Sequence, residues 1–200
     1  MLLTVRKRQE YLKELGYYKG EVDGKQGKLT KAAYLQLQKD YFTRDKDIDG
    51  KYGKNTDILL RSVYNCKDAK YFKVTEFKCK CNGKHCTGYP AEVNKNLVTY
   101  LDEIREKYGK TTKIISGLRC KKNNKANGGA TKSRHLSGKA TDIQITTISN
   151  TPNGRSGIVD EWIKKPNSRY AYCDDYARTK SKTTKPNVPT MGKSTHVDVK

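Results

Sequence analysis

The segment SRHLSGKATD, residues 133 to 142, holds two side chains of the types that bind transition metals. His135 and Asp142 stand seven residues apart, in a chain that has only three histidines. A hydrolytic zinc site takes three nitrogen or oxygen ligands from the protein and leaves one position open for water. Because a histidine or an aspartate taken singly is more often a surface, core or turn residue, the pair needs a third ligand before it predicts a metal site.

The segment THVDV, near the end of the sequence, offers that third ligand. Its polar and apolar residues alternate as in a strand, which puts His196 and Asp198 on one face. The segment around Asp142 is also strand-like, so Asp142 and His196 can lie on neighbouring strands while His135 reaches in from the preceding loop. Both polar side chains of THVDV would then point into the same pocket.

The elements around these residues predict an α+β domain. Residues 92–109 have an apolar stripe at helical spacing, with Gly109 as the stop. A second, shorter helix is expected around Trp162. Strand-like pieces rich in Ile, Val, Thr and Tyr are expected at residues 112–119, 140–146, 169–173 and 195–199.

Three stretches of this half carry a family resemblance: ISGLRC, GGATKSRHLSGKATDI and HVDV. Together they resemble the zinc D-alanyl-D-alanine carboxypeptidases and the related L-alanyl-D-glutamate endopeptidases of phage endolysins, which share the hedgehog/DD-peptidase fold. The pattern of these enzymes is S-x-H-x-x-G-x-A-x-D, followed much later by a histidine. All its fixed positions are present, and they are Ser133, His135, Gly138, Ala140 and Asp142. The resemblance extends over roughly residues 70–200 and implies an antiparallel sheet.

The resemblance assigns roles to individual residues. It implies that His135, Asp142 and His196 bind Zn²⁺. It also implies that Arg119 steadies the substrate carbonyl as negative charge develops, a role suited to a fixed guanidinium. Ser133 would be a hydrogen-bonding residue of the same site. The expected reaction is zinc-assisted hydrolysis of an amide bond.

The proton carrier is the position at which this sequence departs from the family. Several relatives have Glu or Asp three residues before the last zinc histidine, where this chain has Lys193. Asp198 is the candidate base, because it shares a strand face with His196. It can equally orient His196 by accepting the other ring proton. Asp174 and Asp175 are the reserves.

The N-terminal third contains an internal repeat. DGKQGKLT at 23–30 returns as DGKYGKNT at 49–56, and each copy follows a helical run. Gly16 is expected to close the first helix in a left-handed conformation, and Thr30 and Thr56 are expected to N-cap the next two. The sequence therefore predicts a small bundle of three helices.

A calcium loop is the first alternative for the second copy. Asp45, Asp47 and Asp49 match the start of an EF-hand loop, but its twelfth position holds Thr56 where a bidentate glutamate is needed. The mismatch falls on the ligand that matters most, so calcium is not expected.

A second resemblance covers this third of the chain. VRKRQEYLKELGYYKGEVDGKQGKLTKAAYLQLQKDY and the following IDGKYGKNTDILL are similar to the helical peptidoglycan-binding domain of many wall hydrolases. The resemblance spans nearly all of residues 1–62 and implies wall anchoring, with a purely structural module as the alternative. The expected organisation is a peptidoglycan-binding domain at 1–64, a linker at 65–70 and a zinc peptidase domain at 71–200.

Six cysteines raise the question of a second metal site. The pattern C-x-C-x4-C at residues 79–86, next to His85, can hold a structural zinc with Cys66, Cys120 or Cys173 as a further ligand. Reduced buried thiols or a disulfide explain the pattern equally well. No secretory signal is found at the start of the sequence, which favours a reducing compartment.

The charge of the chain indicates a polyanionic partner. Lys and Arg number 42 against 21 Asp and Glu, a formal net charge of +21. Nucleic acid, walls with teichoic acids and anionic membranes all attract such a field. No stretch reaches the roughly 18 apolar residues of a membrane span, so stable membrane insertion is not expected.

These observations lead to one expected function and two alternatives. The expected protein is a monomeric phage endolysin that accumulates in the host cytoplasm and hydrolyses the peptidoglycan stem peptide after lysis begins, as an L-Ala-D-Glu endopeptidase or a D-Ala-D-Ala carboxypeptidase. A catalytically inactive wall-binding protein is the first alternative, because of Lys193. A nucleic-acid-binding protein rests on charge alone and gives no reason for the three zinc ligands, so no nucleic-acid partner is expected.

Overall fold

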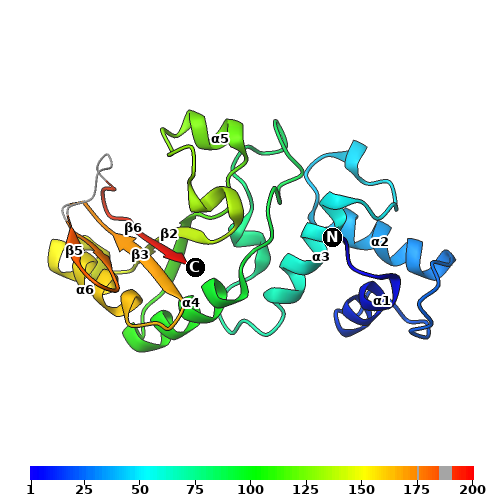
Figure 1. The fold of residues 1–200 in the computed structure, drawn as a ribbon, viewed down its shortest axis with the longest axis horizontal. Helices are drawn as coiled ribbons and strands as arrows, with labels where there is room; N and C mark the ends of the chain where they lie inside the picture. The colour runs from blue at the N-terminus through cyan, green and yellow to red at the C-terminus, as the bar shows by residue number, and fades with distance from the viewer. Residues whose placement is uncertain (175, 185–190) are drawn as a thin grey trace.

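The computed structural model describes residues 1–174, 176–184 and 191–200. Helices alone make up the N-terminal part, and an α+β part follows (Figure 1). The helices are α1 Val5–Glu14, α2 Lys28–Tyr41, α3 Lys54–Asn65, α4 Lys95–Tyr108, α5 Lys121–Ala126 and α6 Pro152–Ile163. The strands are β1 Thr112–Ser116, β2 Ala140–Ile145, β3 Ser168–Tyr172, β4 Ala177–Thr179, β5 Thr183–Thr184 and β6 Thr195–Val199. No helix among the described residues is long and apolar enough to cross a membrane.

The three N-terminal helices pack through α3, which contacts both α1 and α2. The rings of Tyr11 and Tyr64 stack with their centroids 3.5 Å apart, and Leu12 and Leu59 are fully buried. Gly16 follows α1 with a φ of +82°, the left-handed conformation expected from its position after the helix.

The starts of α2 and α3 differ from the prediction. Thr30 and Thr56 do not cap these helices, which begin earlier, with Gly27 and Gly53 at their N-caps. Both threonines are buried inside the first turn, where their hydroxyls bond to residues distant in the sequence. The prediction was therefore wrong because these side chains serve tertiary contacts rather than their own helix ends.

Each DGK turn is built around a glutamine from the helix before it. In the second turn, Gln38 Nε2 donates to Asp49 Oδ1, Lys51 O and Thr56 Oγ1 at 3.0–3.1 Å, while Gln38 Oε1 accepts the Gly50 backbone N–H at 2.8 Å. Gln9 makes the corresponding bonds in the first turn, to Asp23, Gly24, Lys25 and Thr30. The repeat thus has a structural role in satisfying buried backbone groups.

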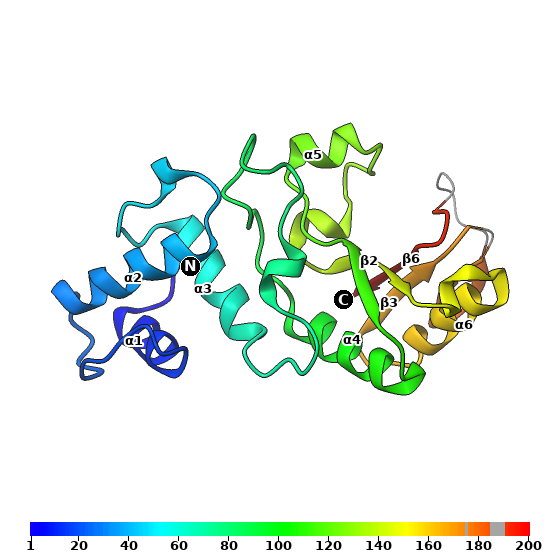
Figure 2. The same ribbon diagram turned by 180° about the vertical axis from the view of Figure 1, so that it is seen from behind.

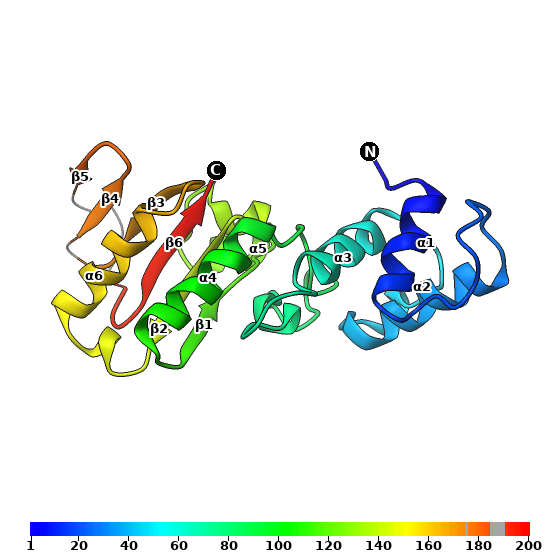
Figure 3. The same cartoon turned by 90° about the horizontal axis from the view of Figure 1, so that it is seen from below.

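The second half is α+β with an antiparallel sheet, as predicted. Its six strands have the order β1-β2-β6-β3-β4-β5, and every neighbouring pair is antiparallel. Figure 3 shows α4 and α6 lying along the sheet. On this side Val197 and Val199 of β6 are fully buried, and Trp162 of α6 donates its indole N–H to Asp198 O at 2.8 Å.

Helix α4 follows the local signals closely. Asn94 caps it by accepting the Leu97 N–H at 3.3 Å, and Gly109 ends it with a φ of +57°. Apolar residues of the predicted stripe, including Leu101 and Ile104, are fully buried. This helix supports the sheet because it contacts both β6 and α6.

The segment between α3 and α4 lies between the two halves (Figures 1 and 2). Helix α3 extends to Asn65, the first residue of the expected linker, and Asn65 Nδ2 donates to Val93 O at 2.9 Å. The Ser62 hydroxyl accepts the Val93 N–H at 3.0 Å, and Thr43 N donates to Thr87 O at 3.1 Å. Hydrogen bonds from the helical part therefore hold this segment in place.

Candidate metal centre

Three buried donor atoms converge where the sequence placed the zinc ligands. His135 Nε2 lies 3.3 Å from Asp142 Oδ1 and 3.3 Å from His196 Nδ1, and the latter two atoms are 2.9 Å apart. Donors about 2.1 Å from a tetrahedral Zn²⁺ are about 3.4 Å from one another. The spacing and the nitrogen and oxygen chemistry of the three donors fit a zinc ion.

The sheet register brings two of the donors together. Asp142 of β2 and His196 of β6 are directly opposite each other across the antiparallel pair. His135 comes from the short 3-10 turn Arg134–Ser137, which ends at Gly138 with a φ of +69°. A side chain at Gly138 would place its Cβ 1.8 Å from the Glu92 carbonyl oxygen. Only glycine therefore allows the turn that positions His135.

Both imidazole rings are held by contacts at their second nitrogen. His135 Nδ1 donates to the Gly117 carbonyl oxygen at 2.6 Å, which leaves Nε2 free to bind a metal. His196 Nε2 lies 3.7 Å from Asp198 Oδ2, on the opposite edge of the ring from Nδ1. Tyr172 stacks on His196 with ring centroids 4.6 Å apart. The rings are therefore oriented before any metal arrives.

Burial and mutual contact set the charges of the three groups. Burial lowers the pKa of His135. At Asp142 burial acts to raise the pKa, but hydrogen bonds from His135 and His196 outweigh it and the pKa lies below its usual range. At His196 burial acts to lower the pKa, yet the two carboxylates of Asp142 and Asp198 outweigh it and the pKa is raised. Asp142 is therefore the anionic centre of the cluster.

The structure also brings Arg119 to the cluster. Its Nη2 lies 2.6 Å from Asp142 Oδ2, and its Nε donates to Ser116 Oγ at 2.8 Å. One oxygen of Asp142 thus faces the histidines while the other is held by the guanidinium. Ser133 precedes the His135 turn, and its hydroxyl makes no capping hydrogen bond there.

A cavity of about 390 Å³ opens beside the cluster. The residues that line it include the six expected to form the site, which are Arg119, Ser133, His135, Asp142, His196 and Asp198. Lys132, Arg134 and Arg169 line it as well, so the cavity wall is rich in positive charge. The three donors therefore face a space large enough for part of a substrate.

One known family matches the part of the chain that carries two of the three donors. Residues 70–153 match the model of the family Peptidase M15. The matched stretch contains Arg119, His135 and Asp142, and it ends before His196. No curated protein matches the chain. The match covers less than half of the sequence, and it supports a peptidase domain of the M15 type in this part of the chain.

Asp198 is almost completely buried behind His196. Its Oδ1 accepts the Tyr170 backbone N–H at 2.8 Å, and its Oδ2 pairs with Arg169 Nη1 at 3.0 Å. The carboxylate therefore contacts the far edge of His196 rather than the three donor atoms. This position favours orientation of the ring over direct action as a base.

The other residues considered for proton transfer lie elsewhere. Asp174 accepts the Met191 N–H at 2.5 Å, approaches Arg155 at 3.5 Å and does not line the cavity. Asp175 lies outside the described residues. Lys193 is exposed and is also not among the lining residues. The lysine therefore does not stand beside the cluster.

Sequence reasoning missed the contacts that support the peptidase site. Tyr172 lies opposite His196 in the sheet register, and Arg169 pairs with Asp198. The strand signal at 169–173 put these residues on a strand but did not reveal that β3 pairs with β6. Gly117 belongs to the ISGLRC segment, in which nothing indicates that its carbonyl oxygen accepts a hydrogen bond from His135.

Proposed function

We propose that this protein is a zinc-dependent peptidoglycan hydrolase that cuts an amide bond in the stem peptide of the bacterial wall. The observation that carries the proposal is the convergence of three buried donors and Arg119 on one cavity. The match of this region to Peptidase M15 supports the same reaction class.

His135, Asp142 and His196 would hold the zinc ion. They supply three ligands and no thiolate, and the cavity beside them leaves room for a water and a carbonyl group, as a hydrolytic site requires. Zn²⁺ bound there would supply a Lewis acid that polarises the scissile carbonyl and acidifies a water molecule.

The surrounding residues would position the reacting groups. Arg119 fixes Asp142 through one guanidinium nitrogen and also lines the cavity, so it is placed to donate to the carbonyl oxygen as negative charge develops. Asp198 keeps the His196 ring turned with Nδ1 toward the metal. We assign Asp198 a positioning role on this geometry.

The charge of the cavity suits an anionic peptide. Lys132, Arg134 and Arg169 line it together with Arg119, and stem peptides carry free carboxylates. An L-Ala-D-Glu bond and a D-Ala-D-Ala bond both lie next to such a carboxylate. The proposal therefore covers an endopeptidase and a carboxypeptidase, and product analysis separates them.

The N-terminal helices would deliver this activity to the wall. Their sequence resembles peptidoglycan-binding domains, and the net charge of +21 would add attraction to teichoic acids. We propose that the protein acts as a monomeric phage endolysin, held in the host cytoplasm until lysis and then bound to the wall. Such binding should weaken with salt, because exposed charges are screened.

Digestion of purified peptidoglycan tests the proposal. The zinc-loaded full chain should release fragments with a new N-terminal D-glutamate (or D-isoglutamine) or free D-alanine, detected by mass analysis. His135→Ala should release neither, whereas His85→Ala, which changes an exposed histidine outside the cluster, should match the unmodified protein.

A different result would select the alternatives. If the zinc-loaded chain sediments with walls but frees no amino groups, the protein is an inactive wall binder. Salt-sensitive retention on DNA that peptidoglycan does not compete away would instead indicate a nucleic-acid-binding protein.

A further inference from the structure

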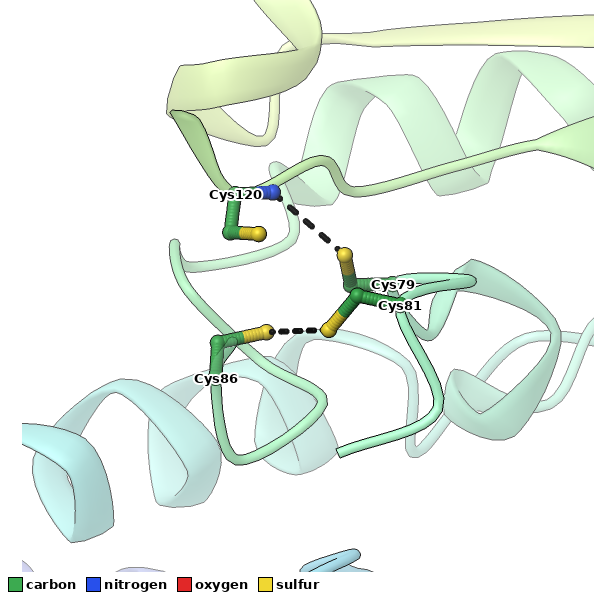
Figure 4. Close-up of side chains that lie close together, drawn as sticks. All are labelled: Cys79, Cys81, Cys86 and Cys120. Atoms are coloured by element: carbon green, nitrogen blue, oxygen red, sulfur yellow. Dashed lines mark hydrogen bonds between the residues drawn. The ribbon is translucent and has the colours of Figure 1, made fainter. Parts of the chain in front are cut away.

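Four cysteines form a second cluster away from the cavity. The sulfur atoms of Cys79, Cys81, Cys86 and Cys120 all lie within 4.8 Å of one another, although Cys120 is 34 positions beyond Cys86. Figure 4 shows the four side chains turned toward a common centre. Cys79, Cys81 and Cys120 are buried and Cys86 is half-buried. Among the described residues, this and the His135 cluster are the groups with metal-binding geometry.

The geometry matches a tetrahedral thiolate site. Sulfur atoms about 2.3 Å from a zinc ion are about 3.8 Å apart, within the 4.8 Å limit that all four satisfy. The Cys81 and Cys86 sulfurs are 3.4 Å apart, much farther than the roughly 2.05 Å of a disulfide bond. Four thiols gathered in this way leave no position open to water.

Backbone N–H groups point at two of the sulfurs. Cys120 N donates to Cys79 Sγ at 3.4 Å, and Asn123 N donates to Cys120 Sγ at 3.5 Å. These contacts stabilise sulfur in the anionic form that binds metals.

Nearby lysines balance the charge that four thiolates would carry. Lys80, Lys84 and Lys122 line a small cavity together with Cys81. A Zn²⁺ ion with four thiolates has a net charge of about −2, which positive side chains at its edge offset. His85 lines the same cavity but is exposed and outside the four-sulfur group.

We propose that Cys79, Cys81, Cys86 and Cys120 bind a second Zn²⁺ ion in a closed, structural site. The ion would join two parts of the peptidase half that the backbone keeps far apart in sequence. One is the segment after the 3-10 turn Val74–Phe77, and the other is the loop between β1 and α5.

This second site would brace the residues that support the first. The loop from β1 carries Gly117, whose carbonyl holds His135, and Arg119, which holds Asp142. Leu118 N donates to Phe77 O at 2.7 Å, and a Cβ at Gly117 would lie 2.6 Å from the Phe77 backbone. Cys120 directly follows Arg119, so zinc bound at Cys120 would hold the β1–α5 loop against the Phe77 segment.

Metal counting on the full chain tests the proposal. The protein purified under reducing conditions should contain two zinc ions per chain. Cys79→Ser and Cys120→Ser should each retain one, and so should His135→Ala, which empties the other centre. Cys66→Ala is the matched control and should retain two, because Cys66 is buried outside both clusters.

A measurement on the unmodified chain covers the case in which a cysteine variant does not fold. Cobalt-loaded protein should show the intense near-ultraviolet sulfur-to-cobalt charge-transfer band of a thiolate site, and a mercurial reagent should release one zinc per chain. The proposal is overturned if the chain holds a single zinc that His135→Ala removes. It is also overturned if the reduced, folded protein has all four cluster thiols open to alkylation with zinc present. Neither result depends on peptidase activity.

Discussion

The two clusters of the α+β half differ in donor type, burial and access. His135, Asp142 and His196 present nitrogen and oxygen atoms to a cavity of about 390 Å³. The cysteine cluster presents four sulfur atoms to one another. Three ligands that leave a coordination position open suit catalysis, whereas four thiolates that fill every position suit structure. The fold would thus keep a catalytic ion beside the cavity and a structural ion away from it.

The supports of the two clusters differ in the same way. Around the first, side chains and carbonyls fix the ligands from outside, as Arg119 does for Asp142 and Gly117 does for His135. Around the second, backbone N–H groups contact the sulfurs directly. Loss of a ligand should therefore abolish chemistry at the first centre and weaken the fold at the second.

His135, Asp142 and His196 form the open centre beside the cavity. Removal of a ligand from this centre should have the largest effect on activity. His135→Ala leaves only two of the three ligands, so we expect peptidoglycan hydrolysis to fall at least about 10³-fold. The melting temperature should change much less, because the sheet and the cysteine cluster remain. Release of amino groups from purified walls and a thermal melt measure the two quantities.

His85→Ala is the control for that experiment, because His85 is an exposed histidine that lies beside the other cluster. Its activity should equal that of the unmodified chain. A parallel collapse of the melting temperature in His135→Ala would contradict the separation of roles.

The four-cysteine cluster is the closed centre. Removal of a ligand from this centre should lower the stability of the fold more than it lowers the activity. Cys79→Ser would lose the ion that joins the Phe77 segment to the β1–α5 loop. With free zinc about 1,000 times above its dissociation constant, that loss corresponds to about 4 kcal/mol of stabilisation. We expect a large fall in the denaturation midpoint, measured by urea titration with and without zinc.

In the same titration, Cys66→Ala should lose only the energy of a buried thiol and should respond to zinc as the unmodified chain does. If Cys79→Ser and the unmodified chain had equal midpoints in zinc, the cysteine cluster would not hold the fold together.

Replacement of Arg119 probes the boundary between the two centres. Arg119→Lys keeps the charge but loses the fork that contacts Asp142 and Ser116 together, so we expect activity to fall by about 10²-fold. Both zinc ions should remain. Zinc content and the rate of wall hydrolysis, measured on one preparation, test this expectation, and loss of either ion would show that Arg119 is mainly structural.

Local signals in the sequence predicted much of the fold and the site. Asn94 and Gly109 mark the ends of α4 because caps are local. The alternation in THVDV placed His196 on the cavity side and Val197 in the core, because side chains alternate along any strand. The register that sets Asp142 opposite His196 then completed the donor set.

Contacts between distant residues could not be predicted in this way. Thr30 and Thr56 are of a residue type that is common at N-caps. Their hydroxyls instead accept hydrogen bonds from glutamines of other helices. The C-x-C-x4-C pattern left Cys66, Cys120 and Cys173 as equal partners, and only the folded chain selects Cys120. The lysine-rich segment 177–194 contains the β4–β5 hairpin, while residues 185–190 lie outside the described residues.

The smallest expected effect concerns Asp198, whose carboxylate either orients His196 or acts as the base. Asp198→Asn keeps the shape of the side chain but removes the charge beside His196 Nε2. A positioning role predicts that zinc affinity falls about 10- to 100-fold and that saturating zinc restores most of the activity. Asp174→Asn, an acid of the same half that does not line the cavity, should leave affinity unchanged. Unchanged zinc affinity in Asp198→Asn, together with a rate that saturating zinc does not restore and an altered pH profile, would instead make Asp198 the base. The measurement therefore distinguishes an Asp198 carboxylate that orients His196 from one that moves a proton. The distance between Asp198 and His196 alone does not distinguish the two roles.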